Sequence, residues 1–137
     1  MTRQVAILGL PQDNNSSFLH GPALAPGRIR EAFHSASANS FTELGHDLAN
    51  RSLWRDAGDL ALEGLSGQDA FNAISQGVSD LLDGGDALIS LGGDHSVAYP
   101  AILAHAERYE PLSILQIDAH SDLYDDFEGN PFSHASP

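Results

Sequence analysis

Three potential metal ligands are spaced two residues apart late in the sequence: Asp118, His120 and Asp122. They follow the aliphatic and β-branched run 112–117, which has the composition of a buried strand. Alternate residues of an extended backbone project to the same side, so two carboxylates and one imidazole would converge on one small volume. Such crowding requires a cation, protons or hydrogen-bond partners to offset repulsion and desolvation. The spacing therefore indicates a chemical site.

A second polar motif, Gly-Gly-Asp-His-Ser at 92–96, follows another β-rich run and adds His95 to the set. Two imidazoles and two carboxylates suit Mn²⁺, Fe²⁺, Zn²⁺ or Ni²⁺, whereas oxygen ligands alone would suit Ca²⁺ or Mg²⁺. The set either fills one tetrahedral site or begins two adjacent sites bridged by Asp118, in which two cations about 3.5–4 Å apart activate a water. Taken singly, His95 is more simply a loop histidine and 118–122 an acidic turn or helix N-cap. Their joint occurrence at strand ends favours a metal site.

The elements that must position these motifs alternate between strand and helix. The pattern predicts strands at 4–8, 53–59, 86–91 and 112–118, and helices at 26–36, 68–82 and 97–109. This order is typical of an α/β domain with a mainly parallel sheet, which binds ligands at the carboxyl ends of its strands. Both motifs fall at that edge. The long polar connection 11–24 is also of a kind that is often functional.

Composition narrows the class of partner. The 137 residues suit a single domain, and 6 Lys plus Arg against 19 Asp plus Glu give a net charge of −13. This charge repels nucleic acid and attracts cations. The absence of Cys excludes disulfides and thiolate metal sites. The apolar run 5–10 is too short for a signal peptide or membrane span, so the chain is expected to be cytoplasmic and free of the membrane.

The two motifs, at 91–96 and 117–122, resemble signatures of the ureohydrolases, the arginase and agmatinase family of dimanganese hydrolases. Supporting similarities lie at Gly-Pro 21–22, Ala-Pro-Gly-Arg-Ile-Arg 25–30, Asp-Ala-Gly-Asp 56–59 and Ser-His-Ala-Ser-Pro 133–137. The resemblance implies a three-layer αβα fold with a mainly parallel sheet, like that of arginases and deacetylases. It also implies that family members hydrolyse a guanidino compound with a metal-bound hydroxide, releasing an amine and urea, or formamide in one branch.

The resemblance assigns roles that the residues alone leave open. His95 and Asp122 would bind one Mn²⁺, His120 the other, and Asp118 would bridge the two ions. His134, which by itself is more simply a surface loop residue, would be the acid/base or proton-shuttle histidine. The Ser-His-Ala-Ser-Pro form favours an agmatine-like substrate, with arginine, formimidoylglutamate and guanidinobutyrate as alternatives.

The sequence also departs from the family pattern. A later Asp-x-Asp motif and a later Glu complete the family's site, and the sequence ends at Pro137 before either. We therefore expect residues 1–137 to be the truncated amino-terminal part of one ureohydrolase domain, without a linker or second domain. An incomplete sheet predicts self-association, and a full-length protein is expected to be a homo-oligomer. The alternatives are a non-catalytic metal-binding module and, less favoured, a binuclear phosphoesterase, whose motifs do not occur here in the required order.

Overall fold

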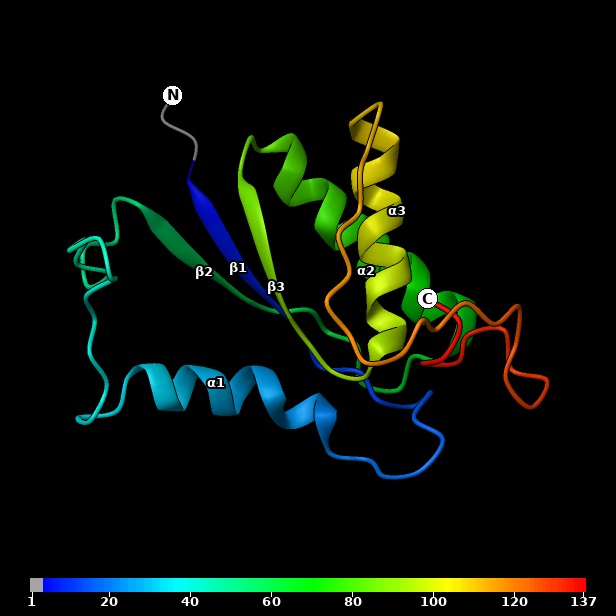
Figure 1. The fold of residues 1–137 in the computed structure, drawn as a ribbon. Helices are drawn as coiled ribbons and strands as arrows, with labels where there is room; N and C mark the ends of the chain where they lie inside the picture. The colour runs from blue at the N-terminus through cyan, green and yellow to red at the C-terminus, as the bar shows by residue number, and fades with distance from the viewer. Residues whose placement is uncertain (1–3) are drawn as a thin grey trace.

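A computed structural model describes residues 4–137, which fold around a three-stranded parallel sheet. The strands are β1 (Val5–Leu10), β2 (Trp54–Asp59) and β3 (Ala87–Gly92), in the order β2-β1-β3. Val5 of the central strand pairs with Trp54 on one side and with Ala87 on the other. All three strands run downward in Figure 1, so their carboxyl ends share one edge. The predicted parallel sheet is confirmed for these three strands.

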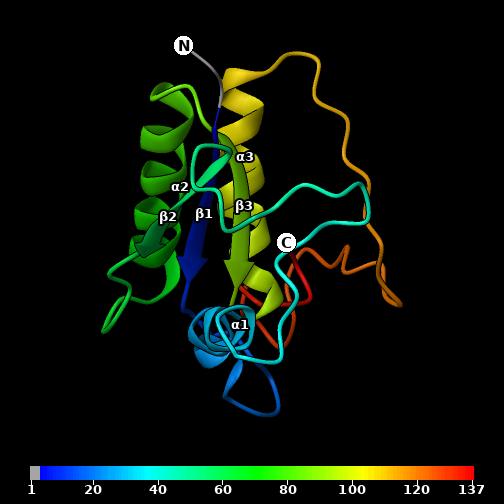
Figure 2. The ribbon, with the colours of Figure 1, turned by 90° about the vertical axis from the view of Figure 1, so that its left-hand side faces the viewer.

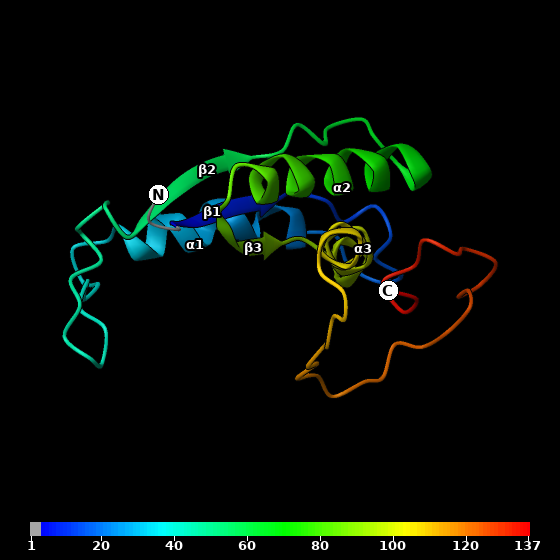
Figure 3. The same ribbon diagram turned by 90° about the horizontal axis from the view of Figure 1, so that it is seen from above.

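Helices cover both faces of this sheet. The chain forms η1 (Pro22–Leu24) and α1 (Ala25–Phe33) after β1, and α2 (Gly67–Asp83) after β2. A short turn η2 (His95–Val97) and α3 (Ala98–Arg108) follow β3. The sheet lies between α1 on one side and the pair α2 and α3 on the other (Figures 1 and 3). This arrangement is that of a truncated three-layer α/β fold.

The main core lies between the sheet and the α2–α3 pair. It is formed by buried aliphatic side chains of β1, the loop after β2, and the helices: Leu8, Leu10, Leu62, Ile74, Val78, Leu82, Val97, Ala101 and Ala104. The residues of α2 in this set recur at spacings of four, which is why the helix could be predicted from its apolar stripe. Burial of each Leu, Ile or Val side chain of this core stabilises the fold by about 1.5–3 kcal/mol.

On the other face, α1 is attached more by polar contacts than by apolar burial. Pro26 is its only buried residue. Arg30 donates to both carboxylate oxygens of Asp56, at 2.8 and 2.9 Å, and to the carbonyl oxygen of Gly58 at 3.0 Å. It also donates to Asp59. The Asp-x-Gly-Asp turn at the end of β2 therefore serves as the docking point of α1.

The predicted strand at 112–118 is wrong. Within residues 4–137 this segment pairs with no strand, and Figure 2 shows the chain after α3 arching away from the sheet before it returns to the lower edge. Leu115 and Ile117 are 86% and 91% exposed. An apolar run is suited to burial, but a strand also needs a neighbouring strand for its backbone groups, and none of the described strands is that neighbour.

Other boundaries shift by a few residues. The first strand continues through Gly9 to Leu10, α1 ends at Phe33, and the helix expected at 97–109 is divided into η2 and α3. No helix among residues 4–137 is long and apolar enough to cross a membrane.

Candidate metal centre

Three of the predicted ligands meet at the carboxyl edge of the sheet. His95, Asp118 and Asp122 each offer one ligand atom, and these atoms all lie within 4.8 Å of one another. His95 Nδ1 is 2.8 Å from Asp122 Oδ2. His95 and Asp122 are partly buried, whereas Asp118 is exposed. Residues that are 27 positions apart in the sequence are thus brought into one cluster.

The turn before His95 is held by a close backbone approach. A Cβ added to Gly93 would lie 1.8 Å from the carbonyl oxygen of Gln12, so only glycine fits there. The N–H of Asp94 donates to that same carbonyl at 2.8 Å. The loop after β1 and the turn after β3 are therefore in direct contact, which fixes the position from which His95 projects.

Asp94 is a structural residue of this edge that the sequence did not single out. The residue is 7% exposed, and its side chain accepts four hydrogen bonds. Oδ1 accepts from the N–H and hydroxyl of Ser96, and Oδ2 accepts from the N–H of Asn15 and the hydroxyl of Ser16. It caps η2 and anchors the loop after β1 with one carboxylate. The only signal in the sequence is the polar run 13–17 in a long connection.

Asp118 remains a carboxylate over a wide pH range. The N–H of His120 donates to its Oδ1 at 2.8 Å and is the largest cause of a pKa lowered below the usual 3.8. Desolvation, the next largest effect, raises this pKa, and the nearby His95 and His120 each lower it by less. Asp118 is therefore in the form that a cation would bind.

His120 departs from the expected arrangement. Its side chain is 79% exposed, its Nδ1 lies 3.5 Å from Asp118 Oδ1, and it does not belong to the cluster of three. The chain is not extended here: residues 119 and 120 form a bend, and Asp122 has a φ of 47°, in the left-handed region. Alternation therefore does not place 118, 120 and 122 on one side, and a ligand role for His120 stays a prediction.

His134 lies near the loop after β1 and is not part of the cluster. Its Nε2 is 2.8 Å from the hydroxyl oxygen of Ser17. Its backbone N–H lies 3.5 Å from the carbonyl oxygen of Asn15, and the side chain of Asn130 donates to that of Asn15 at 3.4 Å. The loop that Asp94 anchors thus also contacts the proposed acid/base histidine, whose catalytic role stays a prediction.

A small cavity adjoins the cluster. It has a volume of about 270 Å³ and is lined by His95 and Asp118 together with apolar side chains that include Ile102, Ile114 and Ile117. The donor set of one imidazole and two carboxylates fits one divalent transition-metal ion, whose ligand atoms lie about 2.0–2.2 Å from it. A second ion would need donors beyond this cluster.

The fold and the cluster together define an α/β protein with a candidate metal site at the carboxyl edge of its parallel sheet. A sequence model described as the arginase family matches residues 3–137. The chain belongs to the arginase family.

Named relatives agree with this assignment. A protein named mitochondrial arginase 1, from Oryza sativa subsp. indica, is 44% identical over an alignment of 138 residues, and the alignment covers 95% of this chain and 40% of that protein. The agmatinase of Bacillus anthracis is 36% identical over 134 residues, with 98% of this chain and 46% of that protein covered. The solved arginase from Medicago truncatula gives a TM-score of 0.91 at 40% identity and covers 98% of this chain and 44% of that one. The chain thus spans less than half the length of these relatives.

Proposed function

We propose that this chain provides the metal-binding amino-terminal part of a hydrolase that cleaves a linear guanidino compound to an amine and urea. The observation that carries the proposal is the convergence of His95, Asp118 and Asp122 at the carboxyl edge of the sheet. Membership of the arginase family supplies the reaction class, since relatives of this chain are named arginase and agmatinase.

Two Mn²⁺ ions are the proposed cofactor. His95 and Asp122 would hold one ion, Asp118 would bridge, and His120 would hold the second after its exposed side chain turns toward the cluster. When bound, the ions would supply Lewis acidity toward the attacking water.

The remaining work falls to the protein's own side chains. His134 is the proposed proton carrier to the leaving amine, and the hydroxyl of Ser17, 2.8 Å from Nε2, would orient its ring. Asp94 would fix both histidines indirectly, because it holds the turn before His95 and the loop that carries Ser17. The net charge of −13 favours a cationic substrate.

Two substrates are supported by different observations. The Ser-His-Ala-Ser-Pro form of residues 133–137 favours an agmatine-like compound, as its resemblance to agmatinases implies. The identities favour arginine, because plant relatives named arginase are 41–44% identical and two named agmatinase are 35–36% identical. Both compounds belong in the first assay.

The test combines metal titration with urea release. Calorimetric titration with Mn²⁺ should show binding that His95→Ala abolishes and that His46→Ala, an exposed loop histidine, leaves unchanged. Urea release from agmatine or arginine should depend on Mn²⁺ and on His95. The absence of urea from both compounds, at saturating Mn²⁺, would refute catalysis by this chain.

The alternative is a non-catalytic metal-binding module. It is favoured by the presence of one cluster of three ligands among residues 4–137, and by the fact that the chain covers only 40% of the length of a relative named arginase. Mn²⁺ binding that depends on His95, without urea from either compound, is the outcome expected of this alternative.

A further inference from the structure

A series of side-chain hydrogen bonds, here called the amide bridge, joins the loop 130–134 to the turn 94–96. Its members come from three segments that are far apart in the sequence: Asn130, Asn15, Ser96 and Asp94. Asn130 Nδ2 donates to Asn15 Oδ1 at 3.4 Å, and Asn15 Nδ2 donates to Ser96 Oγ at 3.0 Å. The hydroxyl of Ser96 in turn donates to Asp94 Oδ1. The amide bridge thus connects the loop that carries His134 with the turn that carries His95.

Both ends of the amide bridge fix the same direction of donation. At one end a carboxylate only accepts, so the Ser96 hydroxyl gives its proton to Asp94 and faces Asn15 with a lone pair. At the other end the N–H of Phe132 only donates, and it occupies Asn130 Oδ1 at 3.0 Å. The NH₂ group of Asn130 is therefore left for Asn15, whose amide meets both requirements in a single orientation. Hydrogen bonds that run in one direction polarise and strengthen one another.

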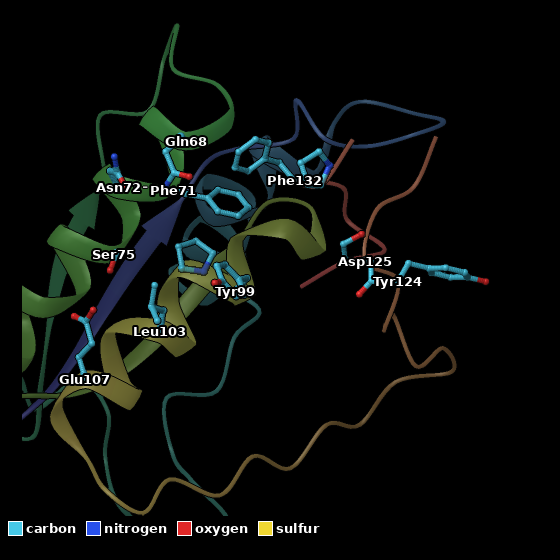
Figure 4. Close-up of a pocket in the computed structure, with 13 residues that line it drawn as sticks. Gln68, Phe71, Asn72, Ser75, Tyr99, Leu103, Glu107, Tyr124, Asp125 and Phe132 are labelled. Atoms are coloured by element: carbon cyan, nitrogen blue, oxygen red, sulfur yellow. Dashed lines mark hydrogen bonds between the residues drawn. The ribbon is translucent and has the colours of Figure 1, made fainter. Parts of the chain in front are cut away.

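The loop 130–134 has a second attachment, which is apolar and leads elsewhere. The ring of Phe132 packs edge to face against that of Phe71 in α2, with 5.0 Å between the ring centroids (Figure 4). Helix α2 holds none of the three residues of the metal cluster. This contact therefore fixes the loop relative to the helical layer, whereas the amide bridge fixes it relative to the turn of His95.

We propose that Asn15 and Asn130 are positioning residues, which hold the loop of His134 at a fixed place relative to the turn of His95. The inference rests on the proposed function for the role of His134 as the proton carrier. A proton carrier must lie within hydrogen-bond reach of the leaving group, and a displacement of about 1 Å can cost about a hundredfold in rate. Ser17 contacts the ring of His134, whereas the amide bridge places the backbone that carries this ring.

Two variants break the amide bridge at different members. Asn15→Ala removes its central amide. Asn130→Asp keeps an acceptor for the N–H of Phe132, so the turn within the loop stays capped, but it has no NH₂ group to donate to Asn15. Asn14→Ala is the matched control, because it removes a side-chain hydrogen bond of the adjacent residue, to the carbonyl oxygen of Leu65 at 3.0 Å, that lies outside the bridge.

Two NMR readouts follow His134 in the metal-free chain, in the presence of a chelator. In both bridge variants its amide should exchange about threefold faster, which is the low end for one neutral hydrogen bond because the 3.4 Å contact is long. The nearest acceptor of this amide is the backbone carbonyl oxygen of Asn15, at 3.5 Å, which every variant keeps. The nitrogen signal of His134 Nε2 should also move toward that of the exposed His46, as the contact with Ser17 loosens. Asn14→Ala should change neither readout.

The double variant tests whether the two residues act through one connection. If they do, Asn15→Ala combined with Asn130→Asp should accelerate exchange no more than the larger single effect, whereas independent contacts give the product of both. An unchanged His134 in either single variant, an equal response to Asn14→Ala, or independent effects in the double variant would overturn the inference. Neither readout uses urea release. A chain that shows this coupling and releases no urea would therefore refute the proposed function while supporting the amide bridge.

Discussion

Replacement of Asp94 by asparagine tests the support of the candidate metal centre. Asp94 is 7% exposed, and the two oxygens of its carboxylate accept hydrogen bonds from four donors. Asp94→Asn keeps the shape but replaces one acceptor oxygen with an NH₂ donor. If the remaining oxygen of the new amide faces Ser96, the NH₂ group faces the N–H of Asn15 and the hydroxyl of Ser16.

The cost follows from these contacts. The hydroxyl of Ser16 can rotate to accept, but the N–H of Asn15 cannot, and an unsatisfied buried donor costs about 1–3 kcal/mol. The bonds that remain also lose the assistance of the negative charge, which adds about 1 kcal/mol. We therefore expect Asp94→Asn to lower the free energy of unfolding by about 2–4 kcal/mol, a large share of the total for a domain of this size.

Urea denaturation followed by the fluorescence of Trp54, the only tryptophan, measures this loss. With a slope of about 2 kcal/mol per molar, the midpoint should fall by about 1–2 M. Hydrogen exchange of the Asn15 amide gives a local reading, because its proton is held by the buried carboxylate in the wild type.

Asp80→Asn is the matched control, since Asp80 is exposed and accepts one hydrogen bond from Gln76 of the same helix. It should change the unfolding free energy by less than about 0.5 kcal/mol. The reasoning is refuted if Asp94→Asn matches this control, or if the exchange of the Asn15 amide does not accelerate.

Three further predictions concern the rest of the chain. Arg30→Lys should lower the unfolding free energy by about 1–2 kcal/mol, because an ammonium cannot replace the paired bonds to the β2 turn; Arg28→Lys, in an exposed pair, should have almost no effect in the same denaturation assay. Asp13 has a pKa below the usual 3.8, first because the N–H of Gly21 donates to it at 2.6 Å, so it binds protons more weakly when folded. The contribution of the Asp13 carboxylate to the free energy of unfolding is therefore complete above about pH 4 and is lost as the pH falls through the folded pKa. In thermal melts, Asp13→Asn should accordingly lose less stability than the wild type as the pH falls over that range. Finally, Ile117 is 91% exposed, so Ile117→Lys should reduce concentration-dependent self-association in sedimentation velocity; a wild-type chain that stays monomeric at all concentrations would contradict this.

The fold could be predicted where its signals are local. The apolar residues of α2 recur at helical spacing, and the same stripe is buried in the structure. The segment 112–118 carries an equally clear apolar signal, yet it is exposed and unpaired. Hydropathy indicates that a segment is suited to burial, but burial also requires a partner surface, and that surface leaves no mark on the segment itself.

The candidate site likewise has one part that could be predicted from the sequence and another that could not. The meeting of His95 with Asp118 and Asp122 could be predicted, because polar residues after parallel strands collect at one edge. The backbone that brings them together is not the expected extended strand, since residues 119 and 120 form a bend and Asp122 has a left-handed φ. The contacts of Asp94 with the loop after β1 span 78 or more residues, so no pattern in the sequence around Asp94 indicates which residues it contacts.

These contacts imply that the proposed active-site residues differ in how firmly they are held in place before an ion binds. Gln12 and Asn15 of one loop hold the turn before His95 through Asp94, and the same loop reaches His134 through Ser17. The side chain of Asp118, by contrast, accepts from a neighbour two residues away and lies on an exposed segment. The two sides of the cluster therefore differ in what supports them. The His95 side is held through Asp94 by long-range hydrogen bonds, whereas residues 118–122 have local ones and the contact of Asp122 with His95 itself. Ion binding should accordingly order residues 118–122 more than residues 94–96, because the latter are already fixed by contacts that require no ion.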